Sequence, residues 1–141
     1  MLKKFFKKKT KDNDDNKNVL IAALLIHAAK IDECYTKIEK NIVKKAMMNL
    51  SKINSDEAEK ILIIAEKKEE ESNQIIEFTK EIKKNPMEFR LKIVEILWKI
   101  VYSDNAKDNY ESNLIRRICG LLYVSDKDSG LIKEKVKKSI K

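Results

Sequence analysis

Residues 92–122 read KIVEILWKIVYSDNAKDNYESNLIRRICGLL, and they align without a gap with residues 20–50, LIAALLIHAAKIDECYTKIEKNIVKKAMMNL. The second copy lies 72 positions after the first, and identities recur along its whole length. They are Ile21 with Ile93, Leu25 with Leu97, Asp32 with Asp104, Glu39 with Glu111, Asn41 with Asn113 and Leu50 with Leu122. A solenoid needs about three stacked units. Two copies therefore favour a closed bundle around a pseudo-two-fold axis.

The composition of the chain is typical of a helical protein. Its 141 residues include only two glycines and one proline, and lysine, isoleucine, leucine and glutamate are abundant. These residue types favour helices, and the length is that of one domain. We therefore predict an all-α fold, a compact helical bundle of about seven helices built from an internally duplicated helical hairpin.

Cap signatures mark the start of the second helix in each copy. Thr36 precedes Glu39 by three residues, and Asp108 precedes Glu111 in the same way. This spacing predicts a capping box, in which two side chains satisfy two backbone amides at a helix start.

Further helices are predicted outside the repeat. One begins at Ser55, one covers about residues 74–83 and a last one follows Ser125. We expect Asn85, which precedes the only proline, to cap the helix that follows. The apolar face of the helix from Ser55 is predicted to contain Ile61, Ile63 and Ile64, with Ala65 as a further candidate.

The formal net charge of +8 is concentrated at the two ends of the chain. Residues 1–17 hold seven lysines against three aspartates, and residues 131–141 hold five lysines against one glutamate. The body between them is neutral, and it contains no nucleic-acid-binding motif. We therefore expect no nucleic acid partner.

The first residues are predicted to be separate from the folded domain. We divide the chain into a basic flexible N-terminal tail, 1–17, and a helical domain, 18–141, because residues 10–18 are rich in Lys, Asp and Asn. The sequence of the tail is compatible with two alternatives, a solvated disordered segment and a short amphipathic helix on an anionic membrane surface. In the amphipathic helix, the apolar residues Met1, Leu2, Phe5 and Phe6 would lie on one side and lysines on the other.

The expected location is the cytoplasm. No apolar stretch approaches the length of a membrane span, and no cleavable leader follows the basic start. Cys34 and Cys119 lie far apart without a second thiol nearby, which indicates reduced thiols.

Two aspartates stand where a helix dipole disfavours them. Asp32 and Asp104 each close a buried helix at its C-terminal end. A divalent cation, a nearby lysine or arginine such as Arg116 or Arg117, or the amides of the turn should compensate them. Glu39 and Glu111 could complete an oxygen-lined site, but capping also explains them. Asp108 lies in the second turn.

Catalytic motifs are missing from the sequence. The single histidine, His27, excludes a histidine-based zinc site, and no glycine-rich phosphate loop or nucleophile motif occurs. We expect a protein that is not an enzyme.

Three stretches together resemble a known family. They are Ala22 to Asp32 (AALLIHAAKID), Leu97 to Asp104 (LWKIVYSD) and Tyr110 to Ile118 (YESNLIRRI). They are similar to the TerB-like family, named for a tellurite-resistance protein and including the N-terminal domain of the membrane co-chaperone DjlA. The resemblance implies an all-α bundle from an internal duplication, acidic turns suspected of binding divalent metal, and a bacterial cytoplasmic location, often near the inner face of the membrane.

Two functional hypotheses follow. The first is a non-enzymatic module in tellurite or envelope stress that binds a divalent cation, Mg²⁺, Ca²⁺ or Zn²⁺, through Asp104, Asp108 and Glu111, with Asp32 and Glu39 as a second set. The alternative is an adaptor for a protein partner or a membrane surface, in which the acidic turns are structural. The sequence does not define the oligomeric state.

Overall fold

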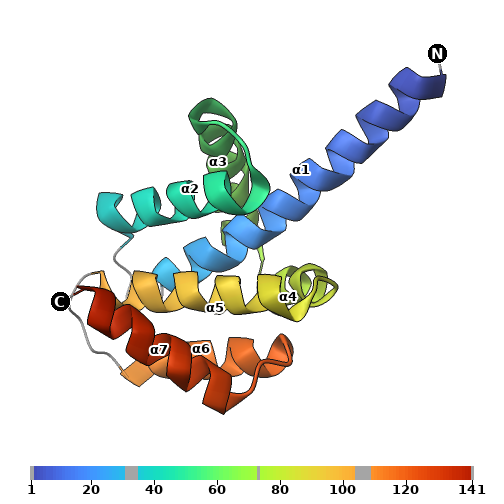
Figure 1. The fold of residues 1–141 in the computed structure, drawn as a ribbon. Coiled ribbons are helices and arrows are strands. Elements are labelled where there is room, and N and C mark those ends of the chain that lie inside the picture. The colour runs from blue at the N-terminus through green and yellow to red at the C-terminus, as the bar shows by residue number, and fades with distance from the viewer. Residues whose placement is uncertain (1, 31–34, 73, 104–108, 141) are drawn as a thin grey trace.

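A computed structural model describes residues 2–30, 35–72, 74–103 and 109–140, and all elements in these ranges are helices (Figure 1). The elements are α1 (Leu2–Ala29), α2 (Lys37–Ser51), α3 (Ser55–Glu71), α4 (Ile76–Lys83), α5 (Met87–Tyr102), α6 (Asn109–Leu121) and α7 (Asp126–Ile140). The prediction of an all-α bundle of seven helices is confirmed.

Helices α1 and α5 form the centre of the bundle. The second half of α1 packs against α2, α3, α4 and α5, while α5 packs against α1, α2, α6 and α7 (Figure 1). Both helices are buried on most sides, as their apolar sequences predict: residues 19–26 of α1 are all buried, and so are seven residues of α5. Burial of such side chains removes apolar surface from water and drives the fold.

The helix bounds correspond at the offset of the repeat to within one residue. The first helix of each copy ends at Ala29 or Tyr102, and the second begins at Lys37 or Asn109. The packing of α1 with α2 and α3 has a counterpart in the packing of α5 with α6 and α7. An internal duplication predicts this correspondence, and the duplication itself stays a prediction.

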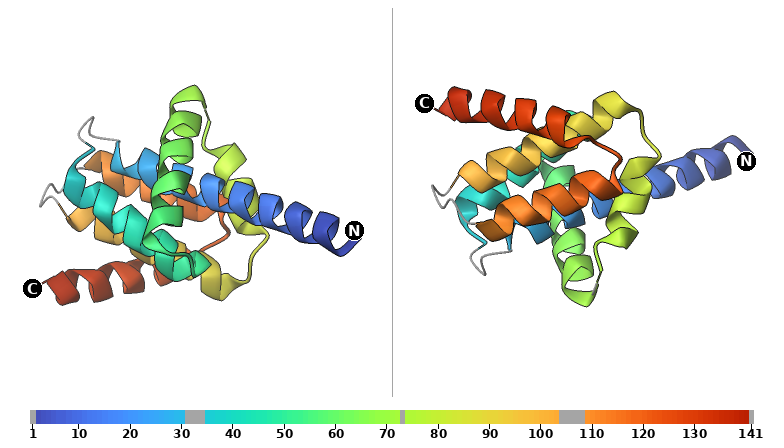
Figure 2. Two further views of the ribbon diagram at one scale, coloured as in Figure 1. Left: turned by 90° about the horizontal axis from the view of Figure 1, so that it is seen from above. Right: turned by 90° about the horizontal axis from the view of Figure 1, so that it is seen from below.

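Helix α1 includes most of the N-terminal segment that we predicted to be a flexible tail. Helix α1 is continuous from Leu2, and its first half projects beyond the bundle (Figures 1 and 2). Extending an existing helix fixes one residue for each new hydrogen bond, which is far easier than starting one, and no glycine or proline interrupts residues 2–29. The division into a tail, 1–17, and a domain, 18–141, stays a prediction.

Helix α3 turns a different face inward from the one we predicted. Ile61 is buried, but Ile63 and Ile64 are 63% and 56% exposed. The buried positions are Ala58, Ile61, Leu62 and Ala65. They follow the i, i+3, i+4, i+7 spacing of one helical stripe, and the two alanines let α3 approach α1 closely.

Asn85 caps a different helix from the one we predicted. Its side-chain amide donates to the carbonyls of Glu81 and Ile82 at the end of α4, at 3.1 and 3.0 Å. Pro86 is the residue that precedes the first turn of α5. The asparagine therefore satisfies carbonyls at a helix end, which lack partners within the helix.

Candidate functional site

Glu39 is the one residue of the predicted metal set whose side chain the structure describes. It lies at the start of α2, is 1% exposed and forms the predicted capping box with Thr36. Its backbone amide donates to Thr36 Oγ1 at 3.1 Å, and its Oε1 accepts from Thr36 N and Oγ1, both at 3.1 Å. A cap of this kind contributes about 1 kcal/mol, so Glu39 has a structural role at this helix start.

The other members of the set fall outside the description. Asp32, Asp104 and Asp108 lie outside the described residues, and so does the side chain of Glu111. Within the described ranges, no three His, Cys, Asp or Glu side chains gather as a metal site. The cation hypothesis therefore stays a prediction.

Both predicted turns are bounded by helices that meet at one end of the bundle. Figures 1 and 2 show that α1 and α5 end there and that α2 and α6 begin there. The macrodipole leaves partial negative charge at the ends of α1 and α5 and partial positive charge at the starts of α2 and α6. The fold thus brings the helix ends that flank both turns to one region.

Acidic side chains of α3 contact the first of these helix ends. His27 Nδ1 lies 3.2 Å from Glu69 Oε1, and Lys30 Nζ lies 3.0 Å from Glu69 Oε2. Glu66 Oε1 accepts from Tyr35 OH at 3.3 Å and pairs with Lys40 Nζ at 3.2 Å. These contacts tie α3 to the end of α1 and the start of α2, and they give the His27 ring a partner in Glu69.

Sequence reasoning missed Glu66 and Glu69 as members of this network. The available signal was the acidic run at the end of α3, where Glu66, Glu69 and Glu70 share a helical stripe. The contact between His27 and Glu69 joins positions 42 residues apart in the sequence, and no local pattern encodes it.

Three groups, Lys30 and Tyr35 in this region and Cys119 on α6, have pKa values raised above their ordinary values. The hydrogen bond with Glu69 raises the pKa of Lys30, so this ammonium stays charged. Burial, followed by the charge of Glu66, raises the pKa of the Tyr35 hydroxyl far above its usual range. Burial also raises the pKa of the Cys119 thiol, which disfavours the thiolate. These groups hold fixed charges and hydrogen bonds rather than exchange protons near neutral pH.

Comparison with protein families identifies the fold. The model of the family described as tellurite resistance protein TerB matches residues 18–134, which is most of the chain. The chain belongs to the TerB family. The match starts in the buried half of α1 and reaches into α7, so the TerB region includes α2 to α6 completely and parts of α1 and α7. Searches of curated proteins and of solved structures found no match.

The TerB assignment has two direct consequences. It suggests a module related to tellurite resistance, and TerB is not a known enzyme family. In the described part of the chain, no helix combines the length and the apolar character that a bilayer crossing requires.

Proposed function

We propose that this TerB-family chain is a non-enzymatic binding module of tellurite or envelope stress whose acidic turns bind a divalent cation, Mg²⁺, Ca²⁺ or Zn²⁺. The supporting observation is the convergence of four helix ends at one end of the bundle (Figure 2). In the sequence, Asp32 falls between α1 and α2, and Asp104 and Asp108 fall between α5 and α6. A cation there would offset carboxylates that follow the negative ends of α1 and α5.

The second turn is the principal candidate in this proposal. Asp104, Asp108 and Glu111 offer only oxygen donors, which suit the hard cations Mg²⁺ and Ca²⁺. Carboxylates also bind Zn²⁺. The first turn is the weaker set because Glu39 already caps α2.

Replacing Asp104 by asparagine tests the proposal through the sign of its effect. Without cation, removing a charge that opposes the dipole of α5 should raise the free energy of unfolding by about 0.3–1 kcal/mol. With cation at about 100 times its dissociation constant, the wild type should gain about 2.7 kcal/mol, which the variant should lose. Thermal melts with and without Mg²⁺, Ca²⁺ and Zn²⁺ measure both effects.

Asp56→Asn is the matched control for this experiment. Asp56 is exposed in the first turn of α3, where its charge favours the helix, so the variant should lose a little stability in every buffer. It should keep the full cation-dependent gain. The proposal is wrong if millimolar cations leave the midpoints of the wild type and of Asp104→Asn unchanged.

A second candidate, a membrane-surface adaptor, is favoured by the projection of α1. The helix extends beyond the bundle from Leu2 onward (Figure 1). Helical spacing puts Leu2, Phe5 and Phe6 on one side and Lys3, Lys4, Lys7 and Lys8 on the other. Each lysine near an anionic surface adds about 1 kcal/mol, so this segment is suited to phospholipid headgroups.

Deleting residues 1–16 should abolish co-sedimentation with anionic vesicles at low salt. The unfolding midpoint should hardly change, because the buried part of α1 starts at Val19 and the contact of Lys17 Nζ with Asn85 Oδ1, 2.6 Å, is retained. The control, Lys137→Gln with Lys138→Gln, removes exposed charge from α7 and should still bind. Equal binding by the full-length and truncated chains would contradict the adaptor hypothesis.

A further inference from the structure

Helices α2 and α5 enclose a groove that neither functional candidate uses. Its volume is about 440 Å³. The apolar residues that line it are Ile42, Ala46, Leu50 and Ile96. Of these, Ala46 and Ile96 are buried, whereas Ile42 and Leu50 are partly accessible. The groove therefore offers apolar surface to a partner.

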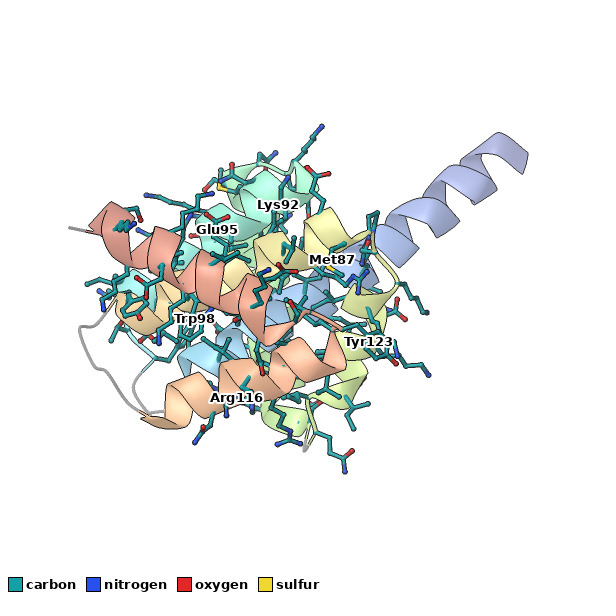
Figure 3. All side chains as sticks on the ribbon, turned by 60° about the horizontal axis from the view of Figure 1, so that its bottom comes forward. Met87, Lys92, Glu95, Trp98, Arg116 and Tyr123 are labelled. Atoms are coloured by element: carbon teal, nitrogen blue, oxygen red, sulfur yellow. The ribbon has the colours of Figure 1, made fainter. Side chains whose placement is uncertain are left out.

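Lysines form the rim of this groove on both sides. Lys45 lies on α2, and Lys92 and Lys99 lie on α5, and all three are exposed. In the described ranges, none of them takes part in an ion pair. The one acidic residue of the rim, Glu95, pairs with Lys135 of α7 at 3.6 Å. Figure 3 shows Lys92 and Glu95 on the side of α5 next to α2.

The neighbouring groove between α2 and α3 provides a comparison for the unpaired lysines of the α2–α5 groove. That groove also has lysines, but Lys40 pairs with Glu66 at 3.2 Å and Lys44 pairs with Glu59 at 3.1 Å. Two of the three lysines that line it are thus paired within the fold, while Lys37 takes part in no ion pair in the described ranges. In the α2–α5 groove, Lys45, Lys92 and Lys99 take part in no ion pair among the described residues, so their positive charge can pair with an acidic ligand.

The lining residues recur at helical spacing on both walls. On α2 they are Ile42, Lys45, Ala46, Asn49 and Leu50, and on α5 they are Lys92, Glu95, Ile96 and Lys99. These i, i+3, i+4, i+7 positions form continuous ridges on each wall. A third helix with apolar residues at the same spacing would fit between the walls, as in helix-in-groove recognition.

We propose that the α2–α5 groove binds an acidic amphipathic helix of a partner protein. The apolar floor would take its apolar stripe, and Lys45, Lys92 and Lys99 would face its Asp and Glu residues. Charge complementarity favours this occupant over a second copy of the chain, whose body has no net charge and whose two ends are basic. A groove of two helical ridges also suits a helix better than a flat layer of lipid headgroups. This site is independent of the cation proposal because it contains none of the acidic turns.

A peptide-display selection with the full-length chain tests the proposal. The library would carry helical peptides of about four turns with leucine at the i, i+3, i+4, i+7 spacing and Glu, Lys, Gln or Ser at the flanking positions. We expect selection of glutamate at these flanks. Adding the selected peptide to the labelled wild-type protein should shift amide NMR signals of α2 and α5 around the groove.

Variants of the rim and the floor then locate the site. The triple change Lys45→Glu, Lys92→Glu and Lys99→Glu should weaken peptide binding about tenfold or more, mainly through the association rate. The matched control, Lys60→Glu, Lys67→Glu and Lys80→Glu, changes the net charge equally at exposed positions outside the groove and should retain most of the affinity. Asn49→Trp should block the groove without a change in charge.

Three outcomes would overturn the proposal. The first is selection of peptides without enriched glutamate, and the second is equal affinity of the two triple variants for the selected peptide. The third is wild-type NMR shifts confined to other helices, a result that does not depend on the folding of any variant. If the selection fails and the rim variant alone loses binding to anionic vesicles, the groove binds lipid headgroups instead.

Discussion

Leu97→Ala is expected to lower the free energy of unfolding by about 3–5 kcal/mol, and Leu25→Ala by a similar amount. Both side chains are fully buried, one in each of the two central helices. Truncation removes the transfer free energy of the lost methyl groups and leaves a cavity between helices that cannot fully collapse. Chemical denaturation monitored by circular dichroism measures the loss.

Comparing the two leucines also tests the repeat. They are aligned in the two copies, so equivalent packing should give similar losses. Leu131→Ala is the control, since Leu131 is 64% exposed on α7 and should change stability by about 0.5 kcal/mol or less. A loss below about 1 kcal/mol for either core variant would contradict the central position of its helix.

Trp98→Ala should cost about 3–5 kcal/mol and loosen the contact between α5 and α7. Trp98 is 5% exposed, and its Nε1 donates to Ser129 Oγ on α7 at 3.2 Å. Its ring also stacks on Tyr102 at a centroid distance of 6.1 Å, and Lys133 Nζ lies 5.2 Å from the ring centre. Figure 3 shows Trp98 on the side of α5 next to α6 and α7.

Trp98→Phe separates the hydrogen bond from the packing. The substitution keeps an aromatic ring but removes the indole donor to the buried Ser129 hydroxyl. We therefore expect it to lower the free energy of unfolding by about 1–3 kcal/mol more than a surface substitution does. Hydrogen exchange of α7 amides should rise more in Trp98→Ala than in Trp98→Phe. Unchanged α7 protection in both variants would show that this tryptophan does not hold α7 in place.

The sequence alone predicted the features that depend on near neighbours. The capping box of Thr36 and Glu39 is confirmed because its partners lie three residues apart and interact in any helix that starts there. Residues 19–26 are all buried, as expected for an uninterrupted apolar run that leaves the helix no polar face. The family match also agrees with the resemblance carried by residues 22–32 and 97–118.

Tertiary structure alone decided which side of each helix meets the core and which distant residues meet one another. Ile63 and Ile64 are exposed because close contact of α3 with α1 selects the stripe with the two alanines, a choice that depends on the partner helix. The pairing of His27 with Glu69, and the placing of Lys45 on the opposite rim from Lys92 and Lys99, depend on the position and crossing of whole helices. Helical periodicity fixes directions within one helix but contains no information on the angle at which two helices pack.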